Sequence, residues 1–231
     1  MKKERILKII SLILVVGILI MLTIEIAPMF KDIATEQGRI ELKNKIENMG
    51  PKGIFIIIGL MIAQIFLAIL PGEPVEILAG MCYGWLWGLI IILIGTFIST
   101  FIIFFAVKKF GRSFIYSFAS KERIEKIENS KLFSNPKTID IIFFILFFIP
   151  GTPKDLFVYI GGLLPVKPAK FLIIATFARI PSIISSTIAG SNIMEGNWGI
   201  IAVAYAVSFI LAGIIIFFVN KKDKRFVEVV K

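Results

Sequence analysis

The sequence contains no histidine and a single cysteine, Cys82. The lack of histidine removes the commonest general base and the commonest metal ligand. One cysteine cannot form an internal disulfide and gives little support to thiol or metal chemistry. Neither a catalytic base–nucleophile pair nor a nucleotide-binding motif is present. We therefore expect no enzyme activity, no cofactor and no bound metal.

Charged residues are scarce and hydrophobic residues are in excess. Charged side chains make up 18% of the 231 residues, hydrophobic ones make up 57%, and the mean hydropathy is +0.90. Soluble domains carry about 25% charged and about 45–50% apolar residues. This composition predicts an all-α polytopic membrane protein with about four full transmembrane helices.

The net charge of +10 is concentrated at the two ends and in the segment 108–137, where eight Lys and Arg face three Glu. Positive loops stay in the cytoplasm, so this pattern indicates topology and not binding to nucleic acid. Both termini are predicted to be cytoplasmic. We expect Lys108, Lys109 and Arg112 to contact anionic lipids.

The apolar runs set the predicted domain boundaries. Residues 1–28 are interpreted as an uncleaved transmembrane helix, because no small-residue cleavage pattern follows the run. Residues 29–52 form either an amphipathic helix on the outer surface or an ordinary solvated connector. Residues 53–219 would be the main membrane domain, and 220–231 a basic cytoplasmic tail.

Within the membrane domain, short and long apolar runs alternate. The run 77–107 is too long for one span and suits a half-helix followed by a full span. The predicted parts are hairpin one (53–83), a span (84–107), a cytoplasmic loop (108–137), hairpin two (138–166) and two spans (168–190 and 198–219). Gly80, Gly84 and Gly88 are interpreted as close-packing positions between helices.

Two breaks in the apolar runs resemble each other. Each reads apolar-Pro-Gly-x-Pro followed by an acid, with Pro71, Gly72 and Pro74 in the first and Pro150, Gly151 and Pro153 in the second. Proline and glycine interrupt helices, so each break would be the tip of a re-entrant hairpin. Because all basic segments share one side, the hairpins would enter from opposite sides, as in the inverted repeats of secondary transporters.

The breaks carry acids at membrane depth, where charge is costly and usually functional. Glu73 and Glu76 follow the first break, and Asp155 follows the second. A buried carboxylate suits proton uptake and release. Alternatively, Glu73 caps the returning half-helix.

Two cations accompany these acids. Lys154 could bind a phosphate headgroup or neutralise a nearby acid. Arg179 lies inside a predicted span just before Pro181, and its guanidinium suits bidentate contact with phosphate. The alternative for Arg179 is an ion pair with an acid of the opposite hairpin. We expect the hydroxyls of Ser182, Ser185, Ser186 and Thr187 to form hydrogen bonds between helices.

Residues 55–215 resemble the DedA/VTT-domain family, also called SNARE-associated Golgi protein-like, and within it the bacterial Tvp-type branch. The matching features are Pro71-Gly72-Glu73 with Gly80 and Gly84, Phe110-Gly111-Arg112, Pro150-x-x-Pro153 with Tyr159 and Gly162, and Ala175-Thr176 with Pro181 and Gly190. The resemblance implies two opposed re-entrant hairpins and lipid translocation, in some members coupled to the proton gradient.

The resemblance also assigns positions. Glu73 matches the acid of the first hairpin, and Gln64 is the polar residue nearest to a second expected acid. Phe147 and Phe148 stand where the family has an arginine before Pro150, and Lys154 is the nearby cation.

The function expected from these observations is a flippase or scramblase of a phospholipid or polyprenyl phosphate, with proton coupling left open. The alternatives are a small-solute or ion transporter and a membrane-organising protein without transport activity. The expected partners are membrane lipids with anionic headgroups, and protons, while a homo-oligomer stays open. An Ile/Phe/Lys bias suggests an AT-rich bacterial genome as the source, and we expect a multi-pass protein of the bacterial cytoplasmic membrane.

Overall fold

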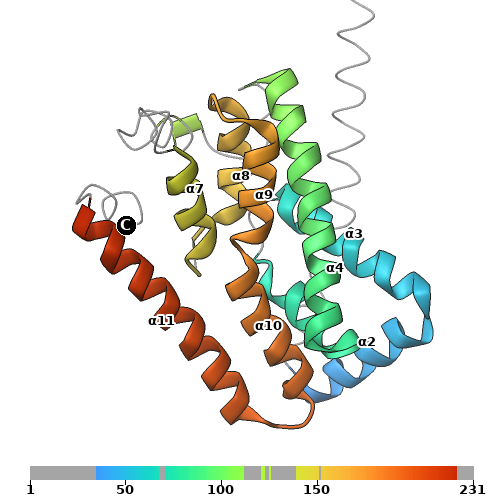
Figure 1. The fold of residues 1–231 in the computed structure, drawn as a ribbon. Coiled ribbons are helices and arrows are strands. Elements are labelled where there is room, and N and C mark those ends of the chain that lie inside the picture. Colours follow the sequence, from blue (N-terminus) through green and yellow to red (C-terminus); the bar gives the residue numbers. More distant parts are fainter. Residues whose placement is uncertain are drawn as a thin grey trace, which may run out of the picture.

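The computed structural model describes residues 35–67, 71–111, 121–122, 125, 139–150 and 152–222. Within these ranges every regular element is a helix, which confirms the predicted all-α class. The elements are α2 (Glu36–Asn48), α3 (Pro51–Leu67), α4 (Glu73–Phe110), α7 (Ile139–Phe148), α8 (Lys154–Leu163), α9 (Pro168–Phe177), α10 (Ile180–Ile193) and α11 (Trp198–Lys222) (Figure 1). The predicted helix at 1–28, Gly151 and nearly all of 112–138 lie outside the described residues.

Three described stretches are long and apolar enough to cross a membrane: α4, α9 with α10, and Trp198–Phe218 of α11. A fourth is counted if α2 and α3 are taken together across their 119° bend. This agrees with the predicted number of about four. Gly50 lies at the bend with a positive φ of 55°, and Pro51 begins α3, as a left-handed glycine and a first-turn proline commonly do at helix boundaries.

Helix α4 is two helices joined by a kink at Gly84, where φ is 76° and ψ is 168°. No atom lies within 4 Å of a Cβ built at Gly84, so the glycine is needed for its backbone conformation. The expectation that Gly84 is a packing position is therefore wrong. Gly80 and Gly88 do pack closely: Gly80 against the backbone of Thr187, and Gly88 against the backbone around Ala79.

The first break lies between two antiparallel segments, α3 and the first half of α4. At the break, a Cβ built on Gly72 would lie 3.2 Å from the Gln64 side chain. At the other end, Gly53 packs against the hydroxyl of Tyr83. The start of α3 and the end of the first half of α4, which are the outer ends of this helix pair, therefore lie together next to the kink of α4.

The second break joins α7 and α8, whose outer ends lie at the opposite end of α4. Asp140 of α7 forms an ion pair of 2.7 Å with Lys170 of α9. Gly162 of α8 packs against Val107, near the end of α4. The two breaks are thus the inner ends of two helix pairs that approach from opposite ends of the second half of α4.

Helices α9 and α10 run end to end beside α4, and a Cβ on Gly190 would collide with the carbonyl oxygen of Ile77 (Figure 1). Helix α11 packs mainly on α10, with a smaller contact to α7, and most of its apolar surface is exposed. Exposed Phe and Ile side chains on α11 fit a helix that faces lipid.

Candidate functional site

Asp155 and Arg179 form a buried ion pair where the two breaks meet. The Arg179 Nη1 atom donates to Asp155 Oδ1 at 2.7 Å, and Arg179 is only 4% exposed. Gln64 Nε2, from α3, donates to Asp155 Oδ2 at 2.6 Å. The carboxylate at the start of α8 is therefore held from α3 and from the α9–α10 turn at once.

The guanidinium of Arg179 has a second, unoccupied edge. Its Cζ lies 5.0 Å from the centre of the Phe147 ring, so one face is covered by an aromatic side chain. Its Nε and Nη2 atoms are buried and have no hydrogen-bond partner among the described residues. These two N–H groups point the same way from one edge of the planar group, which suits two oxygens of a phosphate or carboxylate.

Proline determines where Arg179 lies. Pro181 has no N–H and cannot continue the helical hydrogen bonds of α9, so the chain turns at Ala178 and Arg179 before α10 begins. The sequence suggested that Arg179, if paired, would bind an acid of the opposite hairpin. The structure instead pairs it with Asp155 of the second break, and the first helix pair contributes Gln64.

Lys154, the neighbour of Asp155, points to a different set of partners. Its Nζ atom donates to Ser182 Oγ at 2.5 Å. The buried Glu76 lies near Ser186 and within electrostatic range of Lys154. Tyr205 of α11 lies in the same neighbourhood. Lys154 thus contacts Ser182, and Glu76 lies near Ser186, one helical turn further along α10.

Glu73 lies away from this centre. It is exposed and forms the first residue of α4, and the N-cap position is held by Gly72. Pro71 and Pro153 are exposed, while Gly72, Pro74 and Pro150 are partly buried. The acid that reaches the buried centre from the first break is Glu76.

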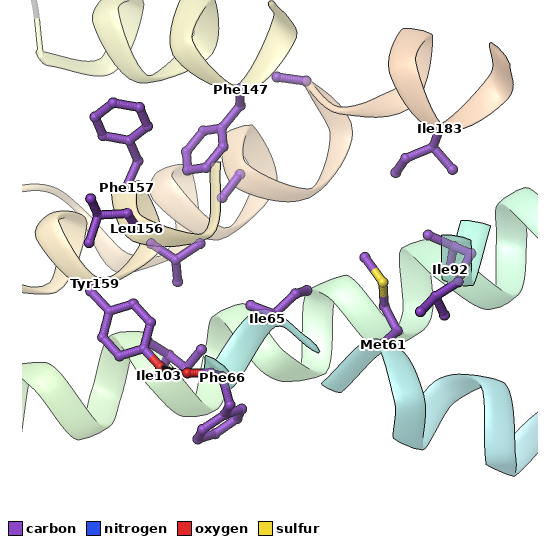
Figure 2. Close-up of a cluster of buried hydrophobic side chains, with 14 of the residues drawn as sticks. Met61, Ile65, Phe66, Ile92, Ile103, Phe147, Leu156, Phe157, Tyr159 and Ile183 are labelled. Carbon is purple, nitrogen blue, oxygen red and sulfur yellow. Dashed lines mark hydrogen bonds between the residues drawn. The ribbon is translucent and has the colours of Figure 1, made fainter. Parts of the chain in front are cut away.

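The carbonyl groups left free by the breaks find partners that the sequence did not point to. Thr152 Oγ1 lies 2.6 Å from the Leu146 carbonyl oxygen and 3.0 Å from that of Ile149, at the end of α7. The Tyr159 hydroxyl donates to the Phe66 carbonyl oxygen at 2.6 Å, which fastens α8 to the end of α3 (Figure 2).

The serine prediction is partly wrong. The hydroxyls of Ser185 and Thr187 donate to carbonyl oxygens of their own helix, as is common for helical Ser and Thr. Ser186 likewise donates to the Ser182 carbonyl oxygen of its own helix at 3.1 Å, and of these four hydroxyls only that of Ser182 links helices, by accepting from Lys154. Ser208 of α11 adds a contact to the Pro181 carbonyl oxygen at 2.7 Å. The described residues contain no cluster of three metal-ligating His, Cys, Asp or Glu side chains.

Comparison with known proteins assigns a family to this arrangement. The sequence model of the VTT domain matches residues 70–192, which is more than half of the chain and includes both breaks, Glu76, Asp155 and Arg179. No curated protein and no solved structure matches the chain. Membership in the bacterial Tvp-type branch stays a prediction. The chain is a multi-pass membrane protein that belongs to the VTT-domain family, the family of the DedA and SNARE-associated Golgi proteins.

Proposed function

We propose that this protein is a lipid translocator that carries the phosphate-bearing headgroup of a phospholipid or polyprenyl phosphate across the membrane. The observation that supports it is the Nε–Nη2 edge of the buried Arg179, which has no hydrogen-bond partner among the described residues and lies where the two breaks meet. A buried guanidinium with two open donors is costly in an apolar interior unless an anion uses them.

In this mechanism Arg179 binds two phosphate oxygens through its free edge. Asp155 holds the opposite side of the guanidinium and Gln64 holds Asp155, so the fork keeps its orientation when the site is empty. Phe147 covers one face and excludes water there. The phosphate thus replaces part of its hydration shell with fixed donors while its lipid chains stay in the bilayer.

The two helix pairs would act as re-entrant hairpins that open in turn to either side. Their opposed directions and their contact at the inner ends support this alternating access, as in transporters with broken helices. Glu76, buried near Lys154, is the carboxylate that would carry a proton if transport is proton-coupled. The role of these residues is binding and transfer, not catalysis.

The orientation follows from the exposed lysines. Lys108, Lys109, Lys167 and Lys170 are exposed where α4 ends and α9 begins. Trp85 and Trp87 are exposed at the other end of the same half of α4. Lysine prefers the cytoplasmic side and tryptophan marks interfaces, so the lysine end would face the cytoplasm of a bacterial cell, together with both termini.

The test is a lipid-flip assay in liposomes with a fluorescent phospholipid and an impermeant quencher. Wild-type protein should allow quenching beyond the outer-leaflet signal, and Arg179→Lys should abolish it, because an ammonium lacks the planar fork. Lys109→Gln, an exposed cation outside the site, is the matched control. Equal activity of the Arg179→Lys and wild-type proteins would refute the proposed headgroup site.

A transporter of small organic anions is the second candidate, because the same fork fits a carboxylate. Flux of a labelled dicarboxylate without lipid flipping, abolished by the same substitution, would favour it. A protein that only organises the membrane would show neither lipid flipping nor dicarboxylate flux, with or without Arg179→Lys.

A further inference from the structure

Three threonines on facing helices have hydroxyls without hydrogen-bond partners among the described residues. Thr96 and Thr100 lie on α4 and Thr176 lies on α9, and all three are buried. A buried hydroxyl without a partner is unfavourable, and most such groups in proteins are satisfied by protein or by ordered water. Three in one bundle therefore point to a shared partner.

Other hydroxyls of the same bundle donate hydrogen bonds to carbonyl oxygens of the preceding helical turn. Ser99 Oγ donates to the Gly95 carbonyl oxygen at 2.6 Å, and Thr187 Oγ1 donates to that of Ile184 at 3.2 Å. This bond to the preceding turn is the usual arrangement for Ser and Thr in helices. Thr96, Thr100 and Thr176 each have a preceding helical turn, yet none of them makes this bond.

The helix register places these threonines at about the same level of the bundle as Arg179. Helices α4 and α9 run antiparallel, with the Phe104 and Phe171 rings stacked at 5.0 Å between centres. Thr100 is one turn and Thr96 two turns from Phe104, and Arg179 is about two turns from Phe171 in the matching direction. Thr176 and Arg179, three residues apart, share one side of a nearly helical segment.

Aromatic side chains close this region toward the lysine end. Phe171 contacts Phe104 and Phe143 at 5.0 Å and Phe147 at 6.0 Å between ring centres. Lys108 lies over the outer side of Phe104, with its Nζ 5.0 Å from the ring centre. The threonines lie on the inner side of these rings.

We propose that Thr96, Thr100 and Thr176 line a water-binding pocket between α4 and α9 that is continuous with the free edge of Arg179. Three hydroxyls and two guanidinium N–H groups supply the several polar partners that buried waters require. The role of the pocket rests on the proposed function: its waters would hydrate the phosphate oxygens that Arg179 does not bind. The pocket itself does not depend on that function.

Radiolytic footprinting tests the pocket with water itself as the probe, because a short X-ray pulse generates hydroxyl radicals from bound water in place. The full-length protein with Cys82→Ser receives one cysteine at a time, as Thr100→Cys, Thr176→Cys or Ser99→Cys. Mass spectrometry then measures the oxidation rate of each introduced thiol. We expect oxidation at positions 100 and 176 to be severalfold faster than at position 99. Equal rates at the three positions would overturn the proposal.

A second experiment removes the hydroxyls without changing side-chain shape. Thr96→Val combined with Thr176→Val should slow oxidation of the cysteine at position 100, because the pocket becomes apolar. The melting temperature, measured alongside, should show that the double variant stays folded. Unchanged oxidation would count against the pocket.

The flip assay distinguishes the existence of the pocket from its contribution to lipid transport. Thr100→Val should reduce lipid flipping severalfold, while Thr100→Ser and the control Ser99→Ala should keep it. Fast oxidation at position 100 together with an inactive wild-type protein would keep the pocket and refute the translocator. Fast oxidation with full activity of Thr100→Val would refute the role of the pocket in transport.

Discussion

Gln64, near the end of α3, donates a 2.6 Å hydrogen bond to Asp155, which lies 91 residues later at the start of α8. This bond joins the inner ends of two helix pairs that enter the bundle from opposite ends. Asp155 also holds Arg179, so the three side chains form one connected polar centre. The amide of Gln64 therefore transmits the position of the first helix pair to the cation that we propose binds the headgroup.

Replacing Gln64 by leucine should weaken both stability and transport. The substitution leaves one oxygen of the partly buried Asp155 carboxylate without its donor, which costs about 1–3 kcal/mol. Thermal unfolding in detergent and the flip assay should both respond. Gln37→Leu, which removes an exposed amide paired with Glu41 on α2, is the control and should leave both unchanged. Unchanged stability of Gln64→Leu would show that the bond contributes little.

Two ion pairs of equal length should differ strongly in their effect on stability. Asp155–Arg179 and Asp140–Lys170 both measure 2.7 Å, but the first is buried and the second is partly exposed. Asp155→Asn leaves a buried guanidinium without its counter-charge and should destabilise the protein by about 3 kcal/mol or more. Asp140→Asn should cost at most about 1 kcal/mol. Chemical denaturation of the two variants measures this difference, and similar losses would contradict a dependence on the greater burial of the Asp155–Arg179 pair.

The first break is followed by two acids, and the structure favours the second, Glu76, as the carboxylate that takes part in transport. Glu76 is buried beside Ser186 and near Lys154, whereas Glu73 is exposed. Glu76→Gln should reduce lipid flipping by about tenfold, the effect of about 1.4 kcal/mol in the barrier, and should flatten its dependence on pH. Glu73→Gln should retain most of the activity. If Glu73→Gln causes the larger loss, the centre of transport lies nearer the exposed tip of the break.

The kink of α4 should depend on Gly84 through its backbone alone. Gly84→Ala puts a Cβ on a residue with φ of 76° and should cost about 1–2 kcal/mol, although no atom crowds it. Gly199→Ala, also in open space but inside a regular helix, should be neutral or slightly stabilising. Thermal unfolding of the two variants compares them directly. Equal stability would mean that the kink tolerates a side chain.

Replacing a glycine at the α4–α10 contact should destabilise the protein through crowding and not through backbone conformation. A Cβ at Gly190 would collide with the backbone carbonyl of Ile77, which cannot move away without shifting a helix. Gly190→Ala should therefore destabilise the protein by about 1–3 kcal/mol. Gly213→Ala, with nothing within 4 Å, is the control. A stable Gly190→Ala protein would show that α10 can shift outward.

The helical class, the approximate number of spans and the breaks were readable from the sequence, because proline, glycine and charge stand out in apolar runs. The partners of the charged residues were not. The partner of Asp155 in α3 depends on how two distant segments approach, and sequence spacing says nothing about that distance. Gly84 shows the same limit: its spacing matches a packing motif, while its function depends on a positive φ that the sequence does not display.

Lys154 and Asp155 are consecutive residues on α8, and they serve two different polar networks. Consecutive positions on an α-helix differ in direction by a fixed angle, since a turn takes 3.6 residues. A rotation of α8 about its own axis that releases Asp155 from Arg179 must therefore also swing Lys154 past Ser182. The two networks are thus coupled through α8, because a rotation of the helix that opens one of them also strains the other.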